Sequence, residues 1–230
     1  MKLDLEGCEL TDNRCSQGLL SRGGAIAIDA ANAELTATGC VFQQNHAESG
    51  GGALTGEDAE LTMIDCVFTD NDASSNGGAI LALGSELGLR NCALRGNETS
   101  HQGGAIWTGD CHLSLVSCLV SGNLAPNIGG GIRFSQNSGA ASLAIVNTTF
   151  TGNSASSTAP GVFPAGGGIH ATGTSINAHV ANSILWDNSS NGSKYLLDSS
   201  FWIDGAAGGQ SGVQAPAKEF HAWLSALRGP

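Results

Sequence analysis

Apolar and polar residues alternate in short stretches that recur along most of the chain. The stretch at 34–38 reads Glu-Leu-Thr-Ala-Thr, the stretch at 40–42 reads Cys-Val-Phe, and the stretch at 26–28 reads Ile-Ala-Ile. Strict alternation of this kind is typical of β-strands with one buried face. We therefore expect three strands per unit, with the apolar residues pointing inward. Turns are expected at the Asn-x-Ala step and at a Gly pair that follow these stretches.

Two motifs repeat at a nearly constant spacing. A GGA(I/L) or GGGI motif stands at 23–26, 51–54, 77–80, 103–106, 129–132 and 166–169. An apolar residue three positions before an Asn recurs at 10–13, 42–45, 68–71, 94–97, 120–123, 150–153 and 185–188. The spacing is 26 residues through the centre of the chain. A fixed period of this length indicates a solenoid, here with about seven coils.

Two solenoid folds have a period close to this one. A leucine-rich repeat runs 20–29 residues and also places Asn after apolar residues. Its return side is usually helical, whereas the return side here is rich in Gly, Thr and Asp, which are poor helix formers. The pattern therefore favours a parallel β-helix with three strands per coil.

The pairing of GGA(I/L/V) with FxxN resembles the repeat of the polymorphic outer-membrane-protein family. More loosely, the coils resemble the right-handed parallel β-helix of the pectate-lyase-like superfamily. The resemblance implies an all-β, right-handed, single-stranded parallel β-helix, and a secreted or cell-surface location. It implies little about activity, because one such fold hosts many functions.

Stacking the coils places equivalent residues in columns about 4.8 Å apart. One column consists of Asn, whose amide can donate to one neighbour and accept from the other. We expect a structural ladder in which Asn also takes the left-handed turn conformation. Its members are Asn13, Asn45, Asn71, Asn97, Asn123, Asn153 and Asn188.

A second column contains five of the seven cysteines: Cys8, Cys40, Cys66, Cys92 and Cys118. Parallel side chains in line do not face each other as a disulfide requires, and they do not converge on one metal ion. Buried free thiols packed as small apolar groups are the favoured interpretation.

Three glutamates stack on the outside of successive coils: Glu34, Glu60 and Glu86. Like charges this close repel each other unless they are bridged. The favoured interpretation is a solvated acidic ridge, and the alternative is a calcium site, because calcium takes several carboxylate oxygens. No other cofactor is expected.

The residue after each glycine motif forms an outward column that ends in Trp107, Arg133 and His170. Indole offers a flat face for a sugar ring, and guanidinium a fork for carboxylates. Two departures from the period, at 135–141 and 156–165, flank this patch. We expect a glycan to bind there, and the alternative is that the insertion covers Trp107 and His170 as ordinary packing.

Composition narrows the list of partners. The net charge of −11 over 230 residues argues against nucleic acid and anionic membranes. The longest apolar runs fall short of a transmembrane helix. The first ten residues carry acids where a secretory signal needs basic and then apolar residues. The surface location therefore rests on the resemblance, and we expect the chain to be part of a larger protein.

The regular repeats are expected to occupy 1–204, and 205–230 to form a linker and a helix. The segment at 195–203 can supply a partial last coil. The segment at 217–228 has apolar residues at helical spacing. Because the open end of a solenoid needs a cap, we expect this helix to cover it.

A non-catalytic, adhesin-like or glycan-binding module is the function that these observations favour. The first alternative is a polysaccharide lyase or glycoside hydrolase of the pectate-lyase-like superfamily. The resemblance would then require calcium-binding Asp residues beside Arg133, and that column contains none. The second alternative is a passive structural stalk without a ligand, and the two insertions beside one patch argue against it.

Overall fold

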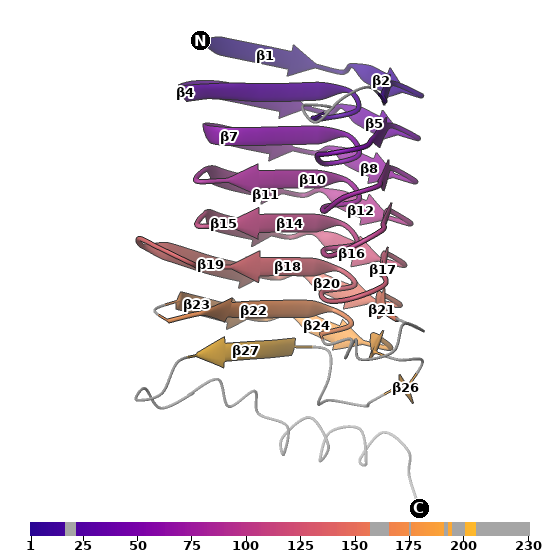
Figure 1. Cartoon of the computed structure of the whole chain (residues 1–230), viewed down its shortest axis with the longest axis vertical. Helices are drawn as coiled ribbons and strands as arrows, with labels where there is room; N and C mark the ends of the chain where they lie inside the picture. Colours follow the sequence, from indigo (N-terminus) through magenta and orange to yellow (C-terminus); the bar gives the residue numbers. More distant parts are fainter. Residues whose placement is uncertain (17–21, 157–165, 175, 191–192, 195–200, 206–230) are drawn as a thin grey trace, which may run out of the picture.

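The chain winds into a stack of β-coils that forms an upright rod (Figure 1). The computed structural model describes residues 1–16, 22–156, 166–174, 176–190, 193–194 and 201–205. These residues form parallel strands, apart from one short antiparallel pair, and contain no helix. The predicted all-β solenoid is confirmed.

One sheet receives a single strand from each coil. Its order is β2-β5-β8-β12-β16-β20-β24, so the described residues make seven coils, as the repeats predict. The strands are β2 (Glu9–Thr11), β5 (Val41–Gln43), β8 (Val67–Thr69), β12 (Ala93–Arg95), β16 (Leu119–Ser121), β20 (Thr149–Thr151) and β24 (Ile184–Trp186). The Cys-x-Phe stretches of the sequence supply these strands.

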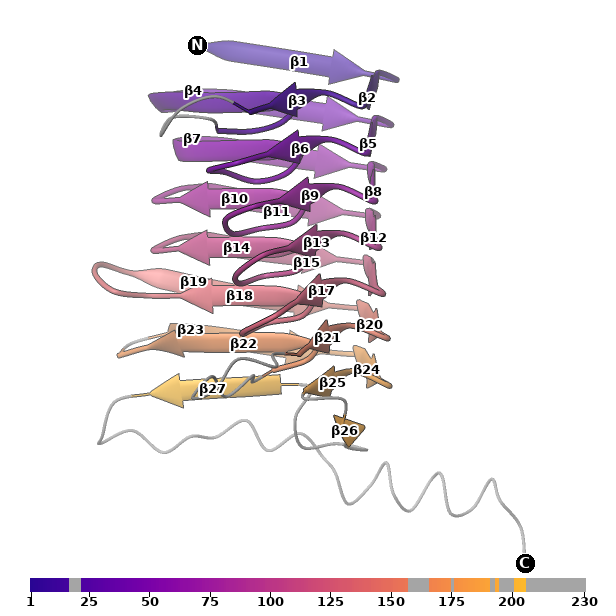
Figure 2. The ribbon, with the colours of Figure 1, turned by 45° about the vertical axis from the view of Figure 1, so that its right-hand side comes forward.

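A second sheet forms where the sequence predicts turns (Figure 2). It consists of two-residue strands: β3 (Arg14–Cys15), β6 (His46–Ala47), β9 (Asp72–Ala73), β13 (Glu98–Thr99), β17 (Leu124–Ala125), β21 (Ser154–Ala155), β25 (Ser189–Ser190) and β26 (Ser193–Lys194). The turn prediction for the Asn-x-Ala step was wrong. The backbone there bonds to the coil before it, for example from the amide of Glu98 to the carbonyl of Asn71 at 2.9 Å. Pairing between coils makes even two residues a strand.

The third sheet unites the two other predicted strands of each coil. They are continuous in β4 (Ile26–Thr38) and β7 (Leu54–Ile64) and separate in later coils. The later pairs are β10 (Ile80–Leu83) with β11 (Glu86–Arg90), β14 (Ile106–Gly109) with β15 (His112–Val116), β18 (Ile132–Ser135) with β19 (Ala141–Val146), and β22 (Ile169–Gly173) with β23 (Ile176–Ala181). β1 (Lys2–Glu6) pairs with β4, and β27 (Phe201–Gly205) pairs with β22. The partial last coil expected from the sequence is thus present over 201–205.

The core fills the inside of the coils with the residues that the alternation places there. Leu35, Ala37, Cys40 and Phe42 are all at most 1% exposed. The rings of Phe42 and Phe68 stack in adjacent coils with centroids 4.5 Å apart. Burial of aliphatic and aromatic side chains in such columns supplies most of the stability of the fold.

The glycine motif allows the turns of successive coils to pack backbone against backbone. A Cβ atom on Gly78 would lie 2.1 Å from the carbonyl oxygen of Gly104 in the next coil. No side chain can occupy that space, so the second glycine of the motif is required by the close approach.

The Asn column is a continuous hydrogen-bonded ladder. The Nδ2 of Asn71 donates to the Oδ1 of Asn97 at 2.9 Å and to the carbonyl of Phe42 at 2.9 Å. The backbone amide of Asn71 donates to the same Oδ1 at 3.0 Å. Each amide therefore links three coils. The left-handed conformation, however, belongs to the residue before each Asn, such as Asp70 with φ 53°. The expectation that Asn itself takes it was wrong.

The cysteine column holds free thiols in the interior. The Sγ of Cys118 donates to the carbonyl of Val116 at 3.4 Å. In the next coil Thr148 takes the same place, and its Oγ1 donates to Val146 at 3.0 Å and accepts from the amide of Cys118 at 3.2 Å. Thr can replace Cys here because both are small groups that donate and accept one hydrogen bond.

Two expectations fall on residues outside the described ranges. These are the linker and cap helix expected at 205–230, apart from Gly205, which belongs to β27, and most of the insertion at 156–165. Within the described part, none of the elements is a helix long and apolar enough to cross a membrane.

Candidate functional site

The column of residues after the glycine motif has the predicted register. Thr55 pairs with Leu81, Leu81 with Trp107, Trp107 with Arg133, and Arg133 with His170. The structure thus brings the three candidate residues into neighbouring strands β14, β18 and β22. They differ in exposure: His170 is 6% exposed, whereas Trp107 and Arg133 are half-buried.

Arg133 and His170 form an internal pair. The Nη1 of Arg133 donates to the Nδ1 of His170 at 2.6 Å, and its Nε donates to the Oε1 of Gln102 at 3.3 Å. Burial, reinforced by the nearby guanidinium charge, lowers the pKa of His170 to about 4. His170 is therefore a neutral acceptor at neutral pH, and it is covered rather than presented to a ligand.

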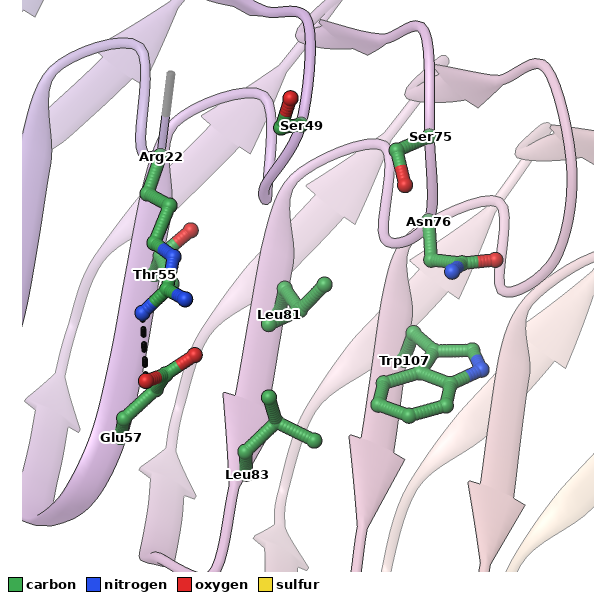
Figure 3. Close-up of a pocket in the computed structure, with 9 residues that line it drawn as sticks. All are labelled: Arg22, Ser49, Thr55, Glu57, Ser75, Asn76, Leu81, Leu83 and Trp107. Carbon is green, nitrogen blue, oxygen red and sulfur yellow. Dashed lines mark ion pairs between the residues drawn. The ribbon is translucent and has the colours of Figure 1, made fainter. Parts of the chain in front are cut away.

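A shallow groove lies on the same face, over coils nearer the N-terminus than this pair. Figure 3 shows the residues that line it. Its volume is about 230 Å³. Strands β7, β10 and β14 supply one part of the lining, and the turns after β6 and β9 supply another. The lining residues are Arg22, Ser49, Thr55, Glu57, Ser75, Asn76, Leu81, Leu83 and Trp107. Of the three candidate residues, Trp107 is the one that lines it.

Trp107 lies along its strand with the indole resting over Gly109. A Cβ on Gly109 would lie 2.9 Å from the Cη2 of Trp107 and 3.0 Å from the Cδ2 of Leu83. The indole occupies space that any side chain at 109 would fill. The ring consequently presents its broad side in the groove, as Figure 3 shows.

An ion pair stands at the other end of the groove. The Nη1 of Arg22 lies 2.5 Å from the Oε2 of Glu57 and 3.4 Å from the Oδ2 of Asp29. Glu57 and Asp29 are register partners on β7 and β4. One guanidinium therefore faces two carboxylates that project from adjacent strands.

Comparison with models of protein families matches residues 2–185 to the family described as "Right handed beta helix region". The chain belongs to the right-handed β-helix family. The match spans about four fifths of the chain and includes every strand that lines the groove. A search of curated proteins finds no match.

Several residues of the groove escaped the sequence analysis. Glu57 and Leu83 belong to the outward column next to that of Trp107, so the repeat itself contained the signal. Arg22 precedes the first glycine motif in a stretch without repeat character, and nothing in the pattern predicts its contact with Glu57.

The turn at 135–141, which departs from the period, is attached to the β-helix by Asp110. The Oδ1 of Asp110 accepts from the backbone amides of Asn137 at 2.6 Å and Ser138 at 2.8 Å. These bonds lower the pKa of Asp110, because amide donors stabilise the carboxylate. Asp110 therefore has a local structural partner.

The glutamate column has the predicted register on the outside of the β-helix. Glu34 pairs with Glu60, and Glu60 with Glu86, and all three are exposed. Within the described residues, no group of three or more His, Cys, Asp or Glu side chains is arranged to hold a metal ion. Calcium binding by this column stays a prediction.

Proposed function

We propose that this β-helix is a non-catalytic module that binds a glycan chain in the groove. The observation that carries the proposal is the indole of Trp107, which lies flat over Gly109 with its broad side in the groove. A flat aromatic face packs well against the apolar face of a sugar ring. The short polar side chains of Ser49, Ser75 and Asn76 supply donors and acceptors for hydroxyl groups.

The shape of the groove also supports a chain-like ligand. Its volume of about 230 Å³ is smaller than the roughly 300–1,000 Å³ of sites that enclose small molecules. The lining strands β7, β10 and β14 are three successive rungs at about 4.8 Å each. A polymer lying along the rod would contact all three rungs without being enclosed.

We place the module in a secreted or cell-surface protein with an adhesin-like role. The support is the similarity of its GGA(I/L) and FxxN repeats to those of polymorphic outer-membrane proteins. The net charge of −11 is consistent with a partner that is neither nucleic acid nor an anionic membrane.

A polysaccharide hydrolase is the second candidate, because Asp29 and Glu57 form a carboxylate pair beside the groove. Hydrolysis by such a pair needs one carboxyl group that is protonated. Both carboxylates, however, are ion-paired with the guanidinium of Arg22. For a lyase, Arg133 would have to act as the base, but it is engaged with His170 and Gln102 and does not line the groove.

The test is binding of the purified chain to a panel of soluble oligosaccharides, measured by calorimetry. Trp107→Ala should lower the affinity for the best oligosaccharide at least about tenfold, a loss typical of a central aromatic contact. Gly109→Ala should weaken binding as well, because the new methyl group lifts the indole. Gly88→Ala on another face, where a Cβ meets nothing within 4 Å, is the matched control.

Each alternative has its own outcome in the same experiment. Release of new sugar ends during incubation would establish an enzyme and overturn the non-catalytic proposal. A chain that folds, as judged by circular dichroism, yet binds none of the panel would be the passive stalk. Binding that Trp107→Ala and Gly109→Ala leave unchanged would place the ligand outside the groove.

A further inference from the structure

The charge distribution around the groove identifies the class of glycan that it accepts. Among the described residues that line it, Arg22 and Glu57 carry a charge. Asp29 adds a second carboxylate to the same guanidinium. The cluster of Arg22, Glu57 and Asp29 therefore has a net charge of −1 beside the groove, on a chain whose net charge is −11.

A guanidinium whose positive charge is already shared by two carboxylates attracts the carboxylate of a ligand less strongly. The 2.5 Å contact between the Nη1 of Arg22 and the Oε2 of Glu57 occupies that nitrogen. A uronate bound to the other N–H groups of Arg22 would lie beside the carboxylates of Glu57 and Asp29 at close range. Like charges placed together at an interface disfavour binding.

The other arginine of this face does not compensate. Arg133 is turned toward Gln102, the carbonyl of Phe134 and His170. It is absent from the residues that line the groove. The cationic contact that the sequence suggested for an acidic sugar is therefore part of an internal network.

The remaining lining is apolar or polar without charge. Leu81, Leu83 and the indole of Trp107 form an apolar strip across β10 and β14. Ser49, Ser75 and Asn76 border it with hydroxyl and amide groups. A sugar that carries hydroxyl groups and no carboxylate matches both parts of this surface.

We propose that the groove selects uncharged glycan chains over acidic ones, with the Arg22–Glu57–Asp29 cluster as the element that excludes carboxylates. The inference rests on the proposed glycan-binding function and adds the class of ligand. It differs from the expectation from the sequence, in which the guanidinium of Arg133 is available to a carboxylate of the glycan.

The experiment compares neutral cello-, xylo- and manno-oligosaccharides with oligogalacturonates of equal length at low ionic strength, where charge effects are largest. The quantity measured is the ratio of the affinity for the best neutral chain to that for the acidic chain. We expect a ratio of at least about ten for the wild-type protein. Glu57→Gln should lower the ratio severalfold, because it removes one of the two carboxylates that face Arg22 and a ligand in the groove. Asp29→Asn, outside the lining, should lower it less.

The outcomes separate this inference from the function on which it rests. An acidic chain that binds more tightly than every neutral one, with a loss in Trp107→Ala, would overturn the selectivity and keep the groove as the site. A ratio that is the same in wild type, Glu57→Gln and Asp29→Asn would show that the cluster does not select. Absence of binding to every oligosaccharide would overturn the proposed function itself.

Discussion

At the scale of single residues, the residue directly before each inward-facing column takes the left-handed backbone conformation that forms the corner of the coil. Asp65, Asn91 and Ser117 precede Cys66, Cys92 and Cys118, and all three have φ between 54° and 56°. Asn, Asp and Gly enter this left-handed region most readily. The sequence shows these residues at the corners, but the adjacent Asn of the ladder is the more conspicuous signal. Its hydrogen bonds, rather than its backbone angle, explain why it recurs.

His170 makes stability depend on pH. Its pKa is about 4 in the folded protein and about 6.5 in the unfolded chain. The unfolded state therefore binds more protons between these values, and stability falls as the pH drops from about 6.5 to about 4. The loss should reach about 3 kcal/mol, since one pKa unit corresponds to about 1.4 kcal/mol. In the His170→Gln variant, Gln keeps an acceptor for Arg133 and does not titrate. The unfolding free energy of this variant should therefore fall less over the same drop in pH.

The measurement is urea unfolding of both proteins at a series of pH values from 4 to 7.5. The difference between the two curves isolates His170 from the carboxylates that also titrate in this range. Curves that run parallel would mean that His170 does not titrate differently in the two states.

At the scale of elements, strands and columns could be predicted to different degrees. Alternation placed the core correctly because one face of each strand is buried. The joining of two predicted strands in β4 and β7 could not be read from the sequence, because the coil bends there through one short irregularity in the pairing, between Asp29 and Ala33. The two-residue strands were missed because their hydrogen bonds run between coils, 26 or more residues apart.

The candidate site was only partly predictable for a related reason. The period fixes which residues share a column, so the neighbours of Trp107 were correct. The period does not set which of them stays open: His170 is 6% exposed, whereas Trp107 is half-buried and lines the groove. Side-chain pairing such as that of Arg22 with Glu57 follows from distances that no repeat encodes.

Asn97→Leu tests whether the ladder is an element of stability. The substitution removes the Oδ1 that accepts from the backbone amide and the Nδ2 of Asn71, and the Nδ2 that donates to Phe68. Each unsatisfied buried group costs about 1–3 kcal/mol. We expect a loss of at least about 3 kcal/mol, or a melting temperature about 10 °C lower. Arg95→Leu, at an exposed position in the same coil, should change it by far less. Equal melting temperatures for the two variants would contradict the ladder's role.

At the scale of the whole molecule, each coil contacts its immediate neighbours, and every column continues from one coil to the next. Stability of such a rod is approximately a sum over coils and the interfaces between them. The same arrangement makes the groove a property of three coils rather than one, because its lining comes from β7, β10 and β14. Removing one coil should therefore abolish glycan binding while the remaining coils still fold.

Deletion of residues 72–97 tests this separation. It joins Asn71 to Glu98, which is the register partner of Asp72, so every column keeps its type of residue. The shortened rod should fold, lose about 5 Å in length by small-angle scattering, and melt within a few degrees of the full chain. It should also lose glycan binding, because Ser75, Asn76, Leu81 and Leu83 are gone. Deletion of 72–84 removes half a coil. Every later coil then lies out of register with the coils before the deletion, so this variant should not fold. If both deletions unfold the chain, stability would depend on this particular coil and not on stacking in register.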